Sequence, residues 1–162
     1  SHASVGTNHW RLDFWQSIFK ENSRDFFTFW FGVGNGPNLA INHGFAYPVQ
    51  GSITTLRSAH SVILTVFGRF GLLGLLLWAW VHLQYFRNVI SALRMAQGSE
   101  RTAYALGLWI SLGYVTVTVV NASFDVMLES PQTAIWYWFM VGAGLALSRM
   151  VRNQGVPVDT RP

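Results

Sequence analysis

The sequence predicts an all-α integral membrane protein, and two observations predict it. The chain has 162 residues, of which 51% are hydrophobic and only 11% are charged, whereas about a quarter of the residues of a soluble domain are charged. The charges also leave three long gaps, of 17 residues after Arg69, 23 after Arg101 and 19 after Glu129. Each gap is close to the ~20 residues that a helix needs to cross ~30 Å of hydrocarbon.

We therefore expect three transmembrane helices, near 71–86, 103–120 and 134–148, within a membrane domain of residues 60–148. A helix that begins near residue 58 is expected to continue into the first span. The glycines at 68, 71 and 74 favour close packing of that helix against its neighbours. Residues 149–162 would form a cytoplasmic tail.

Residues 1–59 are predicted to form a periplasmic loop region that contains an amphipathic helix near 8–20. A fourth uncharged stretch, 26–56, holds seven Gly and Pro residues. Backbone groups freed by so many breakers cannot be satisfied in lipid, so this stretch is predicted to be an ordered surface loop.

The distribution of Lys and Arg in short loops predicts the orientation. Arginines are frequent in 87–102 and in the tail, whereas 121–133 has two acids and no base. We expect 87–102 and the tail in the cytoplasm and residues 1–60 and 121–133 outside. The sequence has no initiator Met and no signal-peptide pattern, and three helices would make a thin membrane domain, so we expect a piece of a longer multi-spanning protein.

Composition excludes several classes of site. The absence of cysteine excludes disulfides, thiolate metal sites and Cys nucleophiles. The basic residues behind the net charge of +4 form no run, which favours membrane lipids or phosphates over nucleic acid as partners.

Asp125 and Glu129 lack a third ligand, so no metal is expected. They are predicted to be solvated or salt-bridged to an outer arginine, with a carboxylate base as the alternative.

Arg11 is the first candidate for function. On a helical wheel from Trp10 to Lys20 it lies in the middle of the apolar side, between Trp15 and Ile18. A guanidinium there must pair, snorkel or bind an anion. Two interpretations of Arg11 are given equal weight. In one it binds an anion, and in the other it is structural and snorkels or pairs with Asp25 or an acid elsewhere.

The second candidate is the segment that holds Arg57 and His60. If a helix begins by residue 57, these two residues are i and i+3 and share a face. A histidine just outside a membrane can be a general base near neutral pH, and an adjacent arginine supplies charge for a phosphate. The alternative is a histidine bonded to the backbone at a helix start. The arginine beside it favours function, and the other four histidines are predicted to be structural.

Gly32 and Gly34 form a Gly-x-Gly turn. No strand is expected before it and no Lys-Ser/Thr pair follows it, so it is weak evidence for nucleotide binding. We expect a tight turn that supports the active face.

Three motifs follow one another along the chain: Arg11-Leu-Asp-Phe-Trp15, then Phe31-Gly-Val-Gly34, then Ser58-Ala-His60-Ser followed by Phe70-Gly-Leu-Leu-Gly74-Leu-Leu. Their order resembles the C-terminal part of the O-antigen ligase and O-antigen polymerase family. The resemblance covers roughly residues 7–148 and implies a fragment of a larger, GT-C-like multi-spanning fold. The chain departs from the family in having Ser61 where Asn often follows the histidine, and in a longer stretch between Gly36 and Arg57.

The resemblance implies a glycosyltransferase of the bacterial inner membrane with its active site on the periplasmic face. The donor would be a glycan on undecaprenyl pyrophosphate, and the acceptor of a ligase would be lipid A–core. Arg11 and Arg57 would hold the pyrophosphate and His60 would take the proton of the acceptor hydroxyl, with no metal or cofactor.

Two alternatives stay open. One is a polymerase or a protein-glycan ligase of the same family. The other is a transporter or flippase fragment, which is disfavoured because a transport pathway should place its charges near the midplane of the spans.

Overall fold

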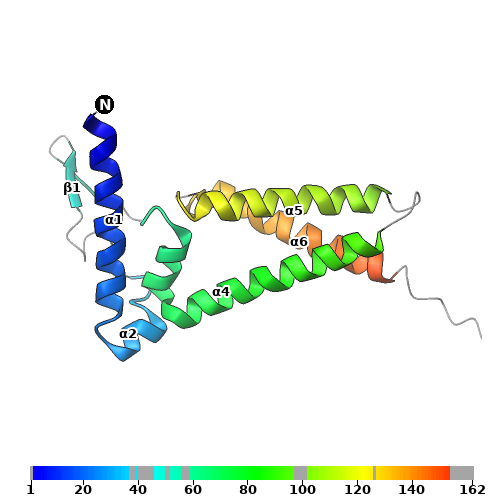
Figure 1. Cartoon of the computed structure of the whole chain (residues 1–162), viewed down its shortest axis with the longest axis horizontal. Coiled ribbons are helices and arrows are strands. Elements are labelled where there is room, and N and C mark those ends of the chain that lie inside the picture. Colours follow the sequence, from blue (N-terminus) through cyan, green and yellow to red (C-terminus); the bar gives the residue numbers. More distant parts are fainter. Residues whose placement is uncertain are drawn as a thin grey trace, which may run out of the picture. The chain divides into compact units, whose positions relative to one another are not determined.

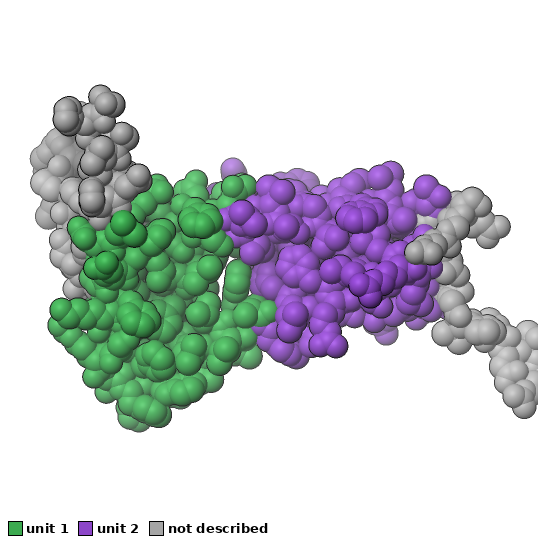
Figure 2. Space-filling model, in the orientation of Figure 1, with its two compact units in different colours: residues 1–79, 121–129 green, residues 80–120, 130–162 purple. Residues whose placement is uncertain are grey.

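The computed structural model describes residues 2–36, 39, 46–49, 52–55, 59–96, 102–125 and 127–153. Its elements are α1 (His2–Asn22), α2 (Phe26–Phe31), β1 (Ala46–Val49), β2 (Ser52–Thr55), α4 (Val62–Met95), α5 (Thr102–Ala122), the 3-10 turn η2 (Met127–Glu129) and α6 (Pro131–Asn153) (Figure 1). They form two compact units: unit 1 contains residues 1–79 and 121–129, and unit 2 contains residues 80–120 and 130–162 (Figure 2).

Among the described residues, three helices are long and apolar enough to cross a membrane, which agrees with the number of spans predicted. They are α4 with 34 residues, α5 with 21 and α6 with 23, and each extends beyond the predicted span at both ends. Because α6 continues to Asn153, Arg149 and Arg152 belong to this helix and not to a separate tail.

α4 consists of two helical segments that meet at Gly71. The φ and ψ angles of this glycine, 66° and −163°, are not helical. Figure 1 shows the helix changing direction sharply after its first turns. The prediction of one continuous helix leading into the first span is therefore wrong at Gly71. Gly68, in contrast, has the close packing predicted for it, since a Cβ there would lie 3.3 Å from side-chain carbons of Ile18 and Leu39.

The start of α4 also differs from the prediction. The helix begins at Val62, and His60 before it has a φ of 50°, in the left-handed region. The prediction of a helix that begins by residue 57 is thus wrong, because residues 59–61 are not helical. The argument that Arg57 and His60 share a helical face loses its basis, and Arg57 itself lies outside the described residues.

The core of unit 1 forms where α1 packs against the first segment of α4. Phe14 and Ile18 of α1 are fully buried, and so are Leu39 and Ala59, while Phe67 of α4 is nearly so. The spacing of the two α1 residues, i and i+4, places both on one face of the helix. The predicted amphipathic helix is confirmed at these positions.

Only part of the apolar side predicted for α1 is buried. Leu12 and Phe19 are expected on its apolar face but are 51% and 59% exposed. The helix is also longer than predicted, since it runs from His2 to Asn22.

The predicted surface loop 26–56 contains regular structure. The carboxylate of Asp25 caps α2 by accepting a hydrogen bond from the Thr28 amide. β1 and β2 pair in antiparallel register, with Ala46 opposite Thr55. This short pair of strands is an addition to the predicted all-α fold.

Unit 2 packs the later part of α4 against α5 and α6 through buried polar side chains. His82 of α4 pairs with Tyr137 of α6, and Tyr85 of α4 lies 2.6 Å from Ser111 of α5. Ser111 donates its one hydroxyl hydrogen to the carbonyl of Met140, so Tyr85 is the donor to Ser111. Interhelical hydrogen bonds of this kind hold helices together where lipid removes the hydrophobic driving force.

The outer faces of these helices are apolar. Large apolar side chains on α4, α5 and α6 are more than half exposed, which is compatible with contact with lipid; they include Leu77, Trp80, Leu106, Trp109, Ile135 and Trp136.

Candidate functional site

His60 lies directly before α4 and faces a carboxylate from another part of unit 1. Its Nδ1 is 3.8 Å from Oδ1 of Asp125, which follows α5. The His60 side chain is 22% exposed and that of Asp125 is 61% exposed. The separation exceeds a hydrogen bond but lies within ion-pair distance of a protonated imidazole. The sequence predicts Asp125 to be solvated or bonded to an outer arginine; its side chain is largely solvated, and it lies beside a histidine as well.

The backbone around His60 is held by α1. The Trp15 indole donates a hydrogen bond of 2.8 Å to the carbonyl of Ala59. Ala59 and Ser61, on either side of His60, are buried. A left-handed φ at a residue other than glycine costs about 1–3 kcal/mol and persists only where the surroundings hold it. The tryptophan and the two buried neighbours supply that restraint.

Arg11 lies one helical turn before Trp15 and on the same face of α1. Its side chain is partly buried, as the helical wheel predicts. Its Nε is buried and has no hydrogen-bond partner among the described residues. Asp25, a predicted partner of Arg11, instead accepts hydrogen bonds from the Thr28 amide and hydroxyl. A buried guanidinium N–H without an acceptor favours the anion-site alternative.

The Gly-x-Gly turn contacts the break in α4. The Val33 amide donates to the Gly68 carbonyl at 3.0 Å, and the Gly34 amide donates to the Arg69 carbonyl at 2.8 Å. These N–H groups cap the first segment of α4, so they are not available to cradle a phosphate. The turn supports the break in α4; its support of an active face stays a prediction.

Two glycines make this contact possible. Gly32 and Gly71 both have positive φ, and a Cβ on either would overlap backbone atoms of the other segment. Only glycine permits both the left-handed conformation and the close approach.

Two further residues fix the break, and the sequence patterns do not single them out. Asn22 is 1% exposed, and its Nδ2 donates to the carbonyls of Phe67 and Gly68, at 2.9 and 3.3 Å. Arg69 donates from Nη1 to the carbonyls of Gly34 and Asn35, at 3.4 and 3.3 Å. Asn22 follows Ile18 by four residues, so extending the buried α1 face by one turn would have pointed to it.

The arrangement suits proton transfer more than metal binding. In the part of the chain that the structure describes, no three His, Asp or Glu side chains gather as a metal site would require. A carboxylate beside one imidazole nitrogen can orient the ring and stabilise its protonated form. The other nitrogen, Nε2, is the atom that could accept a proton from a hydroxyl.

The sequence-predicted site residues thus have different outcomes. His60 lies beside Asp125, Arg11 lies on the α1 face that holds the backbone before His60, and Gly32 and Gly34 lie in the turn that contacts the break in α4. Arg57 lies outside the described residues. In comparisons with models of protein families, with curated proteins and with solved structures, the chain gave no match.

Proposed function

We propose that the chain carries the active site of a membrane glycosyltransferase of the O-antigen ligase type. It would transfer a glycan from undecaprenyl pyrophosphate to lipid A–core at the periplasmic face of the bacterial inner membrane. The observation that carries the proposal is the His60–Asp125 pair at the end of a membrane helix. The buried Nε of Arg11, on the α1 face that binds the backbone beside His60, supports it.

In this mechanism, His60 Nε2 takes the proton of the acceptor hydroxyl as its oxygen attacks the anomeric carbon of the donor sugar. The bond from that carbon to the pyrophosphate oxygen breaks, and its electron pair leaves with the lipid pyrophosphate. Attack opposite the leaving group inverts the anomeric configuration. The Asp125 carboxylate stabilises the imidazolium that forms.

The arginines act on the leaving group. Arg11 offsets the negative charge that grows on the pyrophosphate as the glycosidic bond breaks, and Arg57 is proposed for the same role. The lipid pyrophosphate is already an activated leaving group, so the reaction uses neither a nucleotide sugar nor a metal. The chain would act within a longer protein whose further helices hold the lipid tail.

A polymerase or a protein-glycan ligase would use the same chemistry with another acceptor. A transporter or flippase for the lipid-linked glycan is the second candidate, and the break in α4 at Gly71 favours it. Discontinuous helices are common at the binding sites of transporters. Arg69, the arginine nearest the break, donates to carbonyls of the Gly34–Asn35 turn, which favours a structural role for it over a place on a pathway.

The test uses the full-length protein that contains the chain, expressed in bacterial cells that lack their own ligase. Wild type should attach glycan to lipid A–core. His60→Ala at equal abundance should lower transfer by roughly 10²–10⁴-fold and leave the glycan on its carrier. Asp125→Asn should lower it by up to about fivefold, because an ion pair with an exposed partner is worth about 1 kcal/mol or less. Asp13→Asn, an exposed carboxylate on α1, is the matched control and should have no effect.

A further pair of variants tests the anion site. Arg11→Gln should lower transfer, whereas Arg24→Gln, which removes an exposed arginine paired with Glu21, should not. If His60→Ala transfers as well as wild type, the proposed base is wrong. If wild type only lengthens carrier-linked glycan, the protein is a polymerase. If it moves the glycan across the membrane without transferring it, the transport alternative holds.

A further inference from the structure

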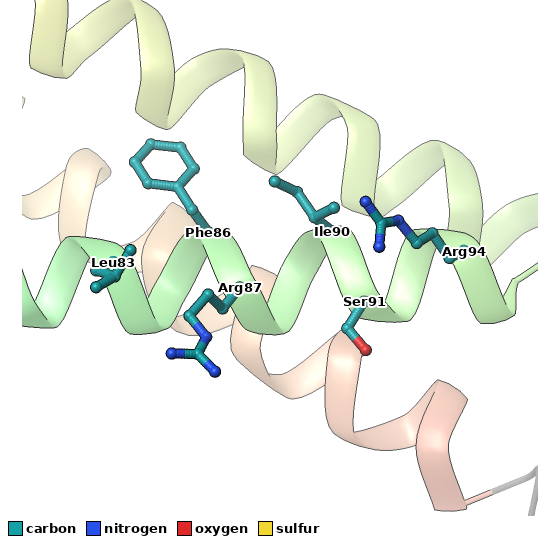
Figure 3. A pocket seen from close by; sticks show the side chains of 6 residues that line it. All are labelled: Leu83, Phe86, Arg87, Ile90, Ser91 and Arg94. Atoms are coloured by element: carbon teal, nitrogen blue, oxygen red, sulfur yellow. The ribbon is translucent and has the colours of Figure 1, made fainter.

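Outside the candidate site, unit 2 has a groove of about 390 Å³ on the surface of α4. Six residues line it, and all come from this one helix (Figure 3): Leu83, Phe86, Arg87, Ile90, Ser91 and Arg94. Their spacing of three and four residues places them along a single stripe of the helix. The stripe combines three large apolar side chains with two guanidinium groups.

The described residues of unit 2 carry charge of one sign. Its described residues include four arginines, Arg87, Arg94, Arg149 and Arg152, and neither Asp nor Glu. All four arginines are exposed. Within the described part of this unit, no carboxylate is present to pair with the two arginines of the groove.

The position of the groove suits a ligand that has an apolar part and an anionic part. Arg87 ends the uncharged stretch that follows Arg69, so it lies at the boundary where a membrane helix leaves the hydrocarbon. A guanidinium at this boundary is stable when it reaches an anion in the headgroup layer. Seven residues rise about 10 Å along a helix, so Arg87 and Arg94 can approach one headgroup from its two sides. In Figure 3 the guanidinium group of Arg87 lies below α4 and that of Arg94 lies above it.

We propose that this groove binds an anionic phospholipid of the surrounding bilayer. Its phosphate lies between Arg87 and Arg94, with the Ser91 hydroxyl as a further donor, and an acyl chain lies along Leu83 and Phe86. The two positive charges select anionic headgroups over zwitterionic ones, since basic surfaces next to membrane helices attract anionic lipids. The site depends on the chain spanning a membrane and is independent of the proposed glycosyl transfer.

The test measures lipid retention by native mass spectrometry, with the chain purified in a neutral detergent. Phosphatidylglycerol and phosphatidylcholine with the same acyl chains are added at equal concentration. Wild type should retain phosphatidylglycerol preferentially. Arg87→Gln/Arg94→Gln should bind it about 25-fold more weakly, because each arginine near an anionic lipid contributes a factor of about five. Arg149→Gln/Arg152→Gln removes two exposed arginines of α6 that do not line the groove, and it should retain the lipid as wild type does.

Two further variants separate binding in the groove from a general attraction between positive charge and lipid. Arg87→Lys/Arg94→Lys keeps the charges and should keep most of the preference. Phe86→Ala keeps both arginines but should weaken phosphatidylglycerol binding, because the acyl chain loses apolar contact. The proposal is overturned if the two lipids bind equally or if the α6 control loses as much lipid as the groove variant. It is also overturned if excess inorganic phosphate displaces the lipid, since the groove would then be a site for soluble anions.

Discussion

The two units stabilise their helices in different ways. In unit 1, the side chains of Trp15, Asn22 and Arg69 donate to backbone carbonyls of irregular segments. In unit 2, side chains bond to one another between helices, as in the Tyr85–Ser111 pair. Unit 1 therefore uses its polar groups to hold a backbone that departs from helical geometry. Unit 2 has regular helices, and its polar groups only fix how they pack.

This difference predicts where substitutions have the largest effect. A change in unit 1 removes the support of backbone groups that have no helical partner, and such groups are costly to leave unpaired away from water. A change in unit 2 removes one pair and leaves the helices themselves intact.

The largest effect is expected for Gly71→Ala. The added Cβ would overlap the backbone at Trp30 and would occupy a left-handed conformation. We expect a loss of about 3 kcal/mol or more in the free energy of unfolding, or a failure to fold. Thermal unfolding in detergent checks this. Gly142→Ala on α6, where nothing lies within 4 Å of the added Cβ, is the control and should unfold no lower than wild type. Equal behaviour of the two variants would show that the break is not rigid.

The second-largest loss of stability is expected for Asn22→Leu. It removes the two hydrogen bonds to the carbonyls of Phe67 and Gly68 while keeping the volume of the buried side chain. We expect a loss of about 1–2 kcal/mol, because the Phe67 carbonyl loses the Asn22 donor, whereas the Gly68 carbonyl keeps the Val33 amide. Ser17→Ala, which removes a hydroxyl bonded within its own helix, is the control with a smaller expected loss. Unchanged thermal stability of Asn22→Leu would mean that other donors satisfy the carbonyls.

Trp15→Phe should have an intermediate effect on stability and a distinct effect on activity. The aromatic character is kept, but the hydrogen bond to the Ala59 carbonyl is lost, at about 1 kcal/mol. Because this bond holds the backbone directly before His60, glycan transfer should fall more than the small loss of stability accounts for. Transfer and thermal unfolding are measured on the same preparation. Loss of both in proportion would assign Trp15 a structural role alone.

The smallest effect is expected in unit 2. Tyr137→Phe removes the hydroxyl that pairs with His82, and such interhelical bonds contribute on average about 0.6 kcal/mol in a membrane protein. The control is Tyr114→Phe, which removes a hydroxyl from α5 and leaves the His82–Tyr137 pair in place. A loss for Tyr137→Phe that matches Gly71→Ala would contradict the difference between the units.

Much of the fold is predictable from the sequence because charge gaps of known length mark membrane helices. The three spans and the buried positions Phe14 and Ile18 follow from composition and periodicity alone. The break at Gly71 could not be predicted in the same way. A glycine in an apolar helix is compatible with both close packing and a break, and only the partner segment at Gly32 decides between them.

The candidate site was predictable in its residue types but not in its pairing. His60 and Arg11 stand out because ionisable groups beside apolar helices are rare and are often functional. Their local geometry depends on distant segments, however. The start of α4 is fixed by a bond from Trp15, and the carboxylate beside His60 comes from the segment after α5. No periodicity along the chain encodes a contact between such segments.

The break in α4 also bears on how the chain enters a bilayer during synthesis. Residues 62–70 rise only about 13 Å as a helix, less than half of the hydrocarbon thickness, whereas residues 72–95 rise about 36 Å. The turn at residues 32–36 leaves the ribosome before Gly71 does. The amides of Val33 and Gly34 are therefore present when the carbonyls of the break are made. In a permuted chain that began with α4, the same carbonyls would be made before their donors.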